Sequence, residues 1–144
     1  NIVQAVFYSK KTSTEEADNR KYVEEVIDFM ELEPYRKKTV GSLSYGIQKS
    51  VEVARALTLG PDLLLLDEPM AGMNIEEKED MVRFVMDIQK ERHITVVLVE
   101  HDLGVVMDIS DYVYGLDFGG LIGAGEPDEV AENPKVVEAY IGEE

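Results

Sequence analysis

Two acidic residues and one histidine stand where they could take part in hydrolysis. Asp67 and Glu68 directly follow an apolar run at residues 63–66, and His101 comes just after a second apolar run at residues 94–99. One carboxylate can hold a hard cation such as Mg²⁺, usually through water, while the other orients or deprotonates an attacking water. Two acids before a proline can also simply end a strand, so the pair alone leaves both interpretations open.

The two apolar runs predict parallel strands whose carboxyl ends share one edge of a sheet. Four consecutive leucines at residues 63–66 cannot alternate between core and solvent, so we expect both faces of that strand to be buried. A helix from Asn74, its N-cap, to about residue 92 joins the runs, with Glu77 in capping-box position. Because a right-handed crossover brings both strand ends to one rim, the histidine is expected beside the two acids.

A third segment, residues 43–49, could bind an anion. Ser44 fits the N-cap of a helix that Gly60 and Pro61 end. A helix N-terminus carries about half a positive charge, and Gly46 would let its backbone approach a phosphate closely. In isolation, the segment is better explained as a capped surface helix with an incidental glycine.

The remaining chain predicts helices and one hairpin. We expect a helix over residues 2–11, a polar break, and a second helix that Thr14 caps and that ends near residue 32. A short helix should begin at Asp102. A β-hairpin around Gly119-Gly120 and two closing helices should follow it.

Composition narrows the classes of partner. The 144 residues are 44% apolar, which suits one domain with a core, and their formal net charge is −16. Such an acidic surface repels phosphate backbones, so we expect no direct binding to nucleic acid. The chain has no cysteine and therefore no disulfide or thiolate metal site. No apolar run approaches the roughly 20 residues of a membrane span.

The order of these segments resembles the ATP-binding cassette (ABC) ATPases. Leu43-Ser44-Tyr45-Gly46 looks like the family's signature motif, residues 63–68 look like its Walker B strand, His101 looks like its switch histidine, and residues 71–74 fall at its D-loop. The resemblance covers essentially the whole chain. It implies an α/β fold of the P-loop NTPase-like ABC ATPase type, with a helical signature subdomain at residues 1–58. Residues 59–144 would form the carboxyl-terminal part of the ATPase core, with parallel strands, a hairpin and helices.

The resemblance also implies roles and cofactors, which are ATP and Mg²⁺. Asp67 would hold the hydrated Mg²⁺, Glu68 would polarise the attacking water, and His101 would contact the γ-phosphate. The residues expected to contact the ATP of a facing subunit are Ser44, Tyr45, Gly46, Gln48 and Asn74. Three positions depart from the family pattern: Tyr45 replaces the first signature glycine, Ile47 its glutamine, and Asn74 the D-loop aspartate.

A narrower resemblance, to the ATPase subunits of branched-chain amino acid importers, lies in Tyr45, residues 100–102 and the tail at residues 134–143. It implies a head-to-tail dimer of ATPase subunits that works with transmembrane permease subunits at the inner, cytoplasmic face of the cell membrane. A lipopolysaccharide-export ATPase has a similar tail and stays an alternative. So do a non-enzymatic interaction fragment and a metal-dependent hydrolase that uses Asp67, Glu68 and His101 as ligands.

One part of such an ATPase is missing from these residues. The P-loop pattern Gly-x-x-x-x-Gly-Lys-Ser/Thr occurs nowhere in the sequence. We therefore expect the chain to be the carboxyl-terminal part of an ABC ATPase domain that cannot hydrolyse ATP unaided. In the family fold the P-loop strand pairs beside residues 94–99. We expect an exposed apolar edge there and self-association through it.

Overall fold

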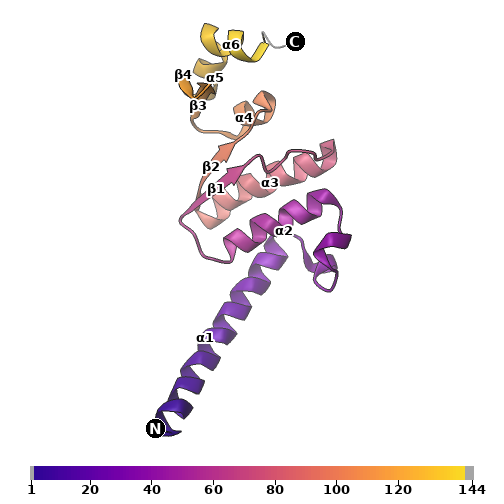
Figure 1. Ribbon diagram of the computed structural model, residues 1–144, viewed down its shortest axis with the longest axis vertical. Coiled ribbons are helices and arrows are strands. Elements are labelled where there is room, and N and C mark those ends of the chain that lie inside the picture. Colours follow the sequence, from indigo (N-terminus) through magenta and orange to yellow (C-terminus); the bar gives the residue numbers. More distant parts are fainter. Residues whose placement is uncertain (1, 142–144) are drawn as a thin grey trace. The chain divides into compact units, whose positions relative to one another are not determined.

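The computed structural model describes residues 2–141, and the side chains of residues 15–140 within them. It is a mixed α/β structure (Figure 1). In chain order its elements are α1 (Ile2–Phe29), the single 3₁₀ turns η1 (Glu33–Tyr35) and η2 (Val40–Ser42), α2 (Tyr45–Leu57), β1 (Leu63–Asp67), α3 (Ile75–Arg92), β2 (Thr95–Val99), α4 (Leu103–Ile109), β3 (Val113–Asp117), β4 (Gly120–Gly125), α5 (Pro127–Ala131) and α6 (Pro134–Ile141). None of the helices within residues 2–141 has the length and apolar character needed to cross a membrane.

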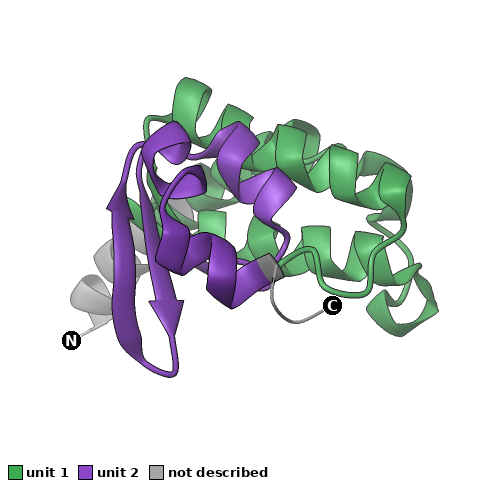
Figure 2. Ribbon diagram, turned by 90° about the horizontal axis from the view of Figure 1, so that it is seen from above, with its two compact units in different colours: residues 1–65, 69–97 green, residues 66–68, 98–144 purple. Residues whose placement is uncertain are grey.

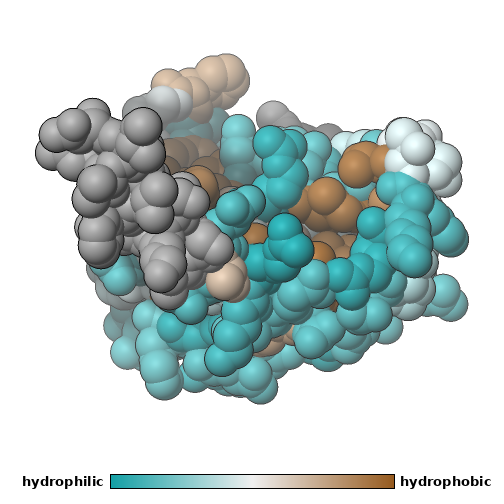
Figure 3. Space-filling view, turned by 90° about the horizontal axis from the view of Figure 1, so that it is seen from below, coloured by the Kyte–Doolittle hydropathy of each residue, from teal (hydrophilic) through white to brown (hydrophobic). Residues whose placement is uncertain are grey.

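The chain folds as two compact units (Figure 2). Residues 1–65 and 69–97 form unit 1, and residues 66–68 and 98–144 form unit 2. Both β1 and β2 therefore contribute residues to each unit. The predicted division at residue 58 separates family subdomains and stays a prediction. On the face drawn in Figure 3, hydrophilic side chains predominate, with smaller hydrophobic areas between them, in keeping with the excess of acids.

Helix α1 is continuous from Ile2 to Phe29, so the predicted polar break with Thr14 as an N-cap is wrong. Lysine, serine and threonine lower helix propensity by only fractions of a kcal/mol each, and neither glycine nor proline interrupts the segment. The helix ends where Glu31 takes a left-handed conformation with φ 55°. The Leu32 N–H donates to the Ile27 carbonyl oxygen at 2.9 Å, which closes the last turn.

Strands β1 and β2 pair as a two-stranded sheet. At its start the Thr95 N–H donates to the Asp62 carbonyl oxygen at 3.0 Å, and at its end the Glu68 N–H donates to the Val99 carbonyl oxygen at 2.9 Å. Start pairs with start and end with end, so the strands are parallel, as predicted. Helix α3 is the crossover between them, and its buried residues are Met81, Phe84, Val85 and Ile88.

Only one face of β1 is buried, so the prediction of a strand buried on both faces is wrong for the described residues. Leu64 and Leu66 are 4% and 8% exposed, whereas Leu63 and Leu65 are 51% and 68% exposed. The side chains alternate as in any strand, and the leucines on the second face remain open. In β2, Val97 and Val99 are also exposed.

Unit 2 contains the predicted hairpin. Strands β3 and β4 pair antiparallel, with Asp117 opposite Gly120. The loop consists of Phe118 and Gly119, both with positive φ, as a tight two-residue hairpin loop requires. The predicted loop at Gly119-Gly120 is therefore wrong by one residue, because Gly120 already belongs to β4. The buried hydrophobic cluster of unit 2 consists of Val113, Val130 and Val136, and partly buried side chains pack against it: Val106, Met107 and Ile122.

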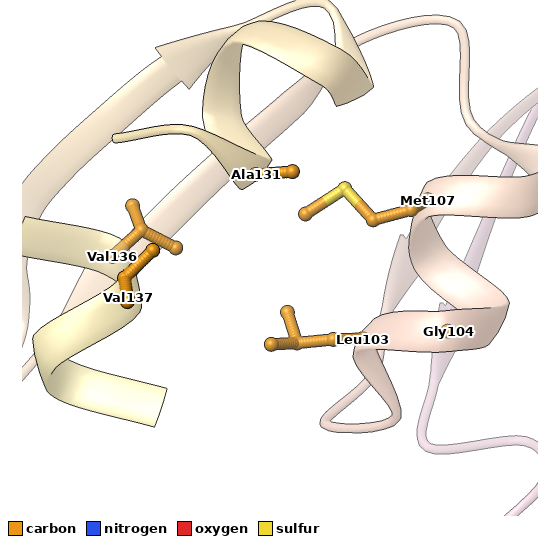
Figure 4. Close-up of a pocket in the computed structure, with 6 residues that line it drawn as sticks. All are labelled: Leu103, Gly104, Met107, Ala131, Val136 and Val137. Carbon is orange, nitrogen blue, oxygen red and sulfur yellow. The ribbon is translucent and has the colours of Figure 1, made fainter. Parts of the chain in front are cut away.

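An apolar cavity of about 200 Å³ lies among the helices of unit 2. In Figure 4, Leu103 and Met107 of α4 point toward Ala131 of α5 and toward Val136 and Val137 of α6. No polar side chain lines this cavity within the described residues, so its lining offers little to orient a polar ligand.

Candidate functional site

The carboxyl end of β1 presents both predicted acids. Asp67 is the last residue of the strand and is exposed. Glu68 follows it with φ 43°, a left-handed conformation that is uncommon for residues other than glycine. Its N–H is held by the Val99 carbonyl oxygen at 2.9 Å. The backbone therefore turns at Glu68 while the sheet anchors it, a conformation that the sequence did not predict.

His101 lies beside Glu68, as predicted. Its Nδ1 is 3.8 Å from Glu68 Oε1, and the side chains of His101 and Glu68 are 68% and 55% exposed. The same nitrogen is 3.7 Å from Glu100 Oε2, and the Glu100 side chain is only 1% exposed. Sequence reasoning placed Glu100 at the strand end but assigned it no role.

Asp67 suits the predicted cation. Mg²⁺ is commonly held by one or two carboxylates together with water and substrate phosphates, so a single exposed carboxylate at the strand end fits it. Among the described residues, no group of three or more histidine, aspartate or glutamate side chains is arranged to hold a metal ion. The alternative of a hydrolase with Asp67, Glu68 and His101 as its ligand set therefore gains no support from the described part of the chain.

The predicted anion segment forms the start of α2, in unit 1. Ser44 is the N-cap and is exposed, and its Oγ accepts a long hydrogen bond, 3.5 Å, from the Ile47 N–H. Gln48 Nε2 donates to the Leu43 carbonyl oxygen at 2.9 Å, which ties the side chain back to the preceding turn. The predicted cap is confirmed, and the helix N-terminus, where Ser44 and Tyr45 are exposed, has its usual partial positive charge.

Gly46 packs against the Glu77 side chain, a contact that the sequence did not predict. It is buried, and a Cβ at this position would lie 2.5 Å from Glu77 Cδ. The first turn of α2 therefore packs directly on the first turn of α3, where Glu77 completes the predicted capping box with Asn74. A larger residue at this position would have to displace the Glu77 side chain, whether or not the Gly46 backbone also approaches a ligand.

Tyr45 and Asn74 flank this contact. Tyr45 is 49% exposed, and a Cβ at Gly72 would lie 3.3 Å from Tyr45 Cε1, so the loop at residues 71–74 packs against the start of α2. Asn74 Oδ1 accepts from the Glu77 N–H at 2.9 Å, so this side chain caps α3.

A cation lies next to the tyrosine. Lys49 Nζ is 5.7 Å from the centre of the Tyr45 ring. Partial burial lowers the pKa of Lys49, but its hydrogen bond to Glu52, the Glu52 charge and Tyr45 together raise it more, so the net pKa is above the ordinary value. The exposed start of α2 thus carries a lysine that stays charged at neutral pH.

Comparison with known proteins identifies the family. An ABC transporter family model matches residues 2–71, and a branched-chain amino acid ATP-binding cassette transporter model matches residues 121–144. The high-affinity branched-chain amino acid transport ATP-binding protein BraF of Pseudomonas aeruginosa is 32% identical over 143 residues, covering 99% of this chain and 56% of BraF. The chain belongs to the ABC transporter ATP-binding family.

Further relatives agree with this assignment. The probable branched-chain amino acid transport ATP-binding protein LivG of Methanocaldococcus jannaschii is 34% identical, covering 98% of this chain and 56% of that protein. The crystal structure of the ADP conformation of MJ1267, an ATP-binding cassette of an ABC transporter, matches with a TM-score of 0.78 and 33% identity. That match covers 88% of this chain and 51% of MJ1267. The predicted ABC ATPase fold class is therefore confirmed, and the chain spans about half the length of the relatives it matches.

Within this ABC family chain, the predicted site residues fall into two groups. Asp67, Glu68 and His101 lie in unit 2, and the structure brings Glu68 and His101 together. The signature and D-loop residues lie together in unit 1; they are Ser44, Tyr45, Gly46, Gln48 and Asn74. The chemical role of each residue stays a prediction.

Proposed function

We propose that this chain is the carboxyl-terminal part of an ABC transporter ATPase that couples ATP binding and hydrolysis to the uptake of branched-chain amino acids. The main support is the contact between Glu68 and His101 at the carboxyl ends of two parallel strands. That edge of an α/β sheet is where ligands bind. The names of the relatives BraF and LivG support the solute, and so does the match of residues 121–144 to the branched-chain family model.

The residues at the strand ends suit phosphoryl transfer, which depends mostly on positioning and charge stabilisation. Asp67 would hold Mg²⁺, whose charge would offset that of the phosphates. Glu68, anchored through its N–H but exposed at its carboxylate, would orient the attacking water. His101 would present a ring nitrogen to the γ-phosphate. The sequence itself provides no P-loop lysine, so the chain alone should not turn over ATP.

The start of α2 would act on a different nucleotide. In a head-to-tail dimer, Ser44 and the backbone of Gly46 would bind the γ-phosphate that the facing ATPase subunit presents, with Tyr45, Gln48 and Asn74 around it. The exposed Ser44 and the helix N-terminus suit an anion. Transmembrane permease subunits would complete the transporter at the inner face of the cell membrane.

The test measures ATP hydrolysis and leucine uptake by the assembled transporter that carries this sequence. We expect Glu68→Gln to slow hydrolysis by about 10²–10⁴-fold while ATP still binds, because a water-orienting base is lost. The matched control is Glu79→Gln, which neutralises an exposed acid of α3 and should leave the rate unchanged. Hydrolysis by Glu68→Gln at the wild-type rate would contradict the assignment. The isolated 144-residue chain should show no ATP turnover, and turnover that disappears in its Glu68→Gln variant would refute the need for a P-loop elsewhere.

The transported solute is tested separately. A lipopolysaccharide-export ATPase is the second candidate, because its tail resembles residues 134–143. Proteoliposomes with the assembled transporter should accumulate labelled leucine only when ATP is supplied. Absence of leucine uptake from vesicles that hydrolyse ATP would favour the export alternative over the importer.

A further inference from the structure

Glu100 is a buried carboxylate next to the proposed hydrolytic residues. It follows the last residue of β2 and precedes His101. Its side chain is 1% exposed, while those of His101 and Glu68 are 68% and 55% exposed. Burying a carboxylate is unfavourable unless hydrogen bonds or opposite charge compensate for the lost water. The position of this group therefore calls for a reason beyond strand formation.

Glu100 contacts both the backbone and the ring of His101. Glu100 Oε2 accepts a hydrogen bond from the His101 backbone N–H at 3.3 Å, and the same oxygen lies 3.7 Å from His101 Nδ1. Glu68 Oε1 lies 3.8 Å from that nitrogen. The Nδ1 edge of the imidazole thus faces two carboxylates, and the opposite nitrogen, Nε2, is the one left for a ligand.

The two carboxylates differ in their freedom. A buried side chain keeps one rotamer because packing restricts it, whereas an exposed glutamate can move and exchange with water. Glu100 can therefore serve as a fixed reference for the ring, and Glu68 remains free to act on water. In other sites, a carboxylate bonded to one imidazole nitrogen sets the tautomer and the orientation of the other.

We propose that Glu100 is a positioning residue that holds the Nδ1 edge of His101 and so directs Nε2 toward the γ-phosphate. This proposal rests on the proposed function for the identity of the ligand. It goes beyond that function by assigning a separate role to each of two glutamates: Glu100 orients the histidine, and Glu68 orients the water.

The first test locates the proton on the ring by ¹⁵N NMR of the 144-residue chain. The sequence has only two histidines, so the exposed His93, which ends α3, serves as an internal control. We expect neutral His101 to carry its proton on Nδ1, against the Nε2–H form that free histidine favours. Glu100→Gln should lower the Nδ1–H population of His101 several-fold and leave His93 unchanged, and the matched Glu68→Gln should have the smaller effect.

Two results would overturn the proposal. One is the finding that wild-type His101 carries its proton on Nε2. This measurement uses the wild-type chain, so it does not depend on whether a variant folds. The other is a folded Glu100→Gln chain whose His101 spectrum equals that of the wild type. Neither result depends on ATP turnover. Failure of the proposed function would instead appear as unchanged hydrolysis by Glu68→Gln.

A kinetic measurement separates positioning from folding. In the assembled transporter, Glu100→Gln should lower kcat at least about tenfold with little change in KM for ATP, because a misdirected ring affects the reaction more than binding. Glu100→Asp, which keeps the charge, should recover part of the rate. An unchanged kcat in Glu100→Gln, or a loss confined to KM, would contradict the positioning role.

Discussion

Both faces of the β1–β2 sheet carry leucine and valine side chains, but their surroundings differ. On one face, Leu64 and Leu66 are almost completely buried. On the other, Leu63, Leu65 and Val97 are about half exposed or more. A βαβ unit covers one face of its strands with the crossover helix, and here that helix is α3. A leucine contributes to stability only where another element packs on it, so identical side chains one residue apart should behave differently.

The largest loss of stability is expected on the buried face of the sheet, and a matched substitution on the open face gives the comparison. Leu64→Ala should lower the free energy of unfolding by about 2–5 kcal/mol, because it removes buried methyl groups and leaves a cavity. Leu65→Ala, at a residue 68% exposed, should change it by no more than about 0.5 kcal/mol. Urea denaturation of both variants gives the comparison. Equal losses would mean that both faces are packed in solution.

The apolar edge expected at residues 94–99, which include β2, should also make the chain associate with itself. Val97→Lys places a charge in this strand and should weaken self-association at least about tenfold, or about 1.4 kcal/mol. Leu59→Lys is the matched control, because Leu59 is 84% exposed and lies outside the sheet. Sedimentation velocity over a range of concentrations measures the effect. A wild-type chain that stays monomeric at high concentration would contradict the expected association.

A smaller loss of stability is expected where α2 packs on α3 in unit 1. Gly46→Ala should lower the free energy of unfolding by about 1–2 kcal/mol, because the new Cβ would displace Glu77 from its capping box. Gly41→Ala, whose Cβ would meet no atom within 4 Å, is the control and should be close to neutral. Thermal unfolding measures both. In the Glu77→Ala background the Gly46→Ala loss should shrink, and an unchanged loss would rule out this contact as its cause.

The smallest loss of stability is expected from removing an ion pair in unit 1, between Arg83 and Glu31. Arg83 holds both carboxylate oxygens of Glu31, at 3.0 and 3.1 Å. The hydrogen bond to Glu31 raises the pKa of Arg83 above its usual value; burial opposes this, and Asp80 adds to it. Because the pair is partly exposed, Arg83→Gln should lower the free energy of unfolding by at most about 1 kcal/mol, and less at high salt. Arg20→Gln, at an exposed position of α1, is the control. A loss above 2 kcal/mol would show that the pair does more than a surface contact.

Much of the fold could be predicted because its signals are local. The predicted caps at Ser44 and Asn74 depend on hydrogen bonds to residues only a few positions away, and both are confirmed. The predicted helix start at Asp102 is confirmed as well, with Asp102 as the N-cap. The hairpin itself was predicted from its glycine pair, but its loop lies one residue earlier than predicted, because Gly120 pairs with Asp117. The polar residues before Glu15 misled the prediction, since a weak local preference does not break a helix without glycine or proline.

The sequence predicted which residues lie at the candidate site but not all the contacts that they make. The order of a strand, a helix and a strand places Glu68 and His101 on one rim for any right-handed crossover. The left-handed turn at Glu68 and the buried carboxylate of Glu100 could not be predicted, because both depend on what packs around the strand ends.

By itself, the amino-acid sequence determined the order of helices and strands from α2 onward, the caps at Ser44 and Asn74, the parallel strands that lead to the acids and the histidine, and the resemblance to ABC ATPases. Only the tertiary structure decided which leucines are buried, that Gly46 packs against the Glu77 side chain, and which glutamate faces His101 from the protein interior. The reason is physical: capping and turn formation involve neighbours along the chain, whereas burial and close approach depend on residues far apart in sequence.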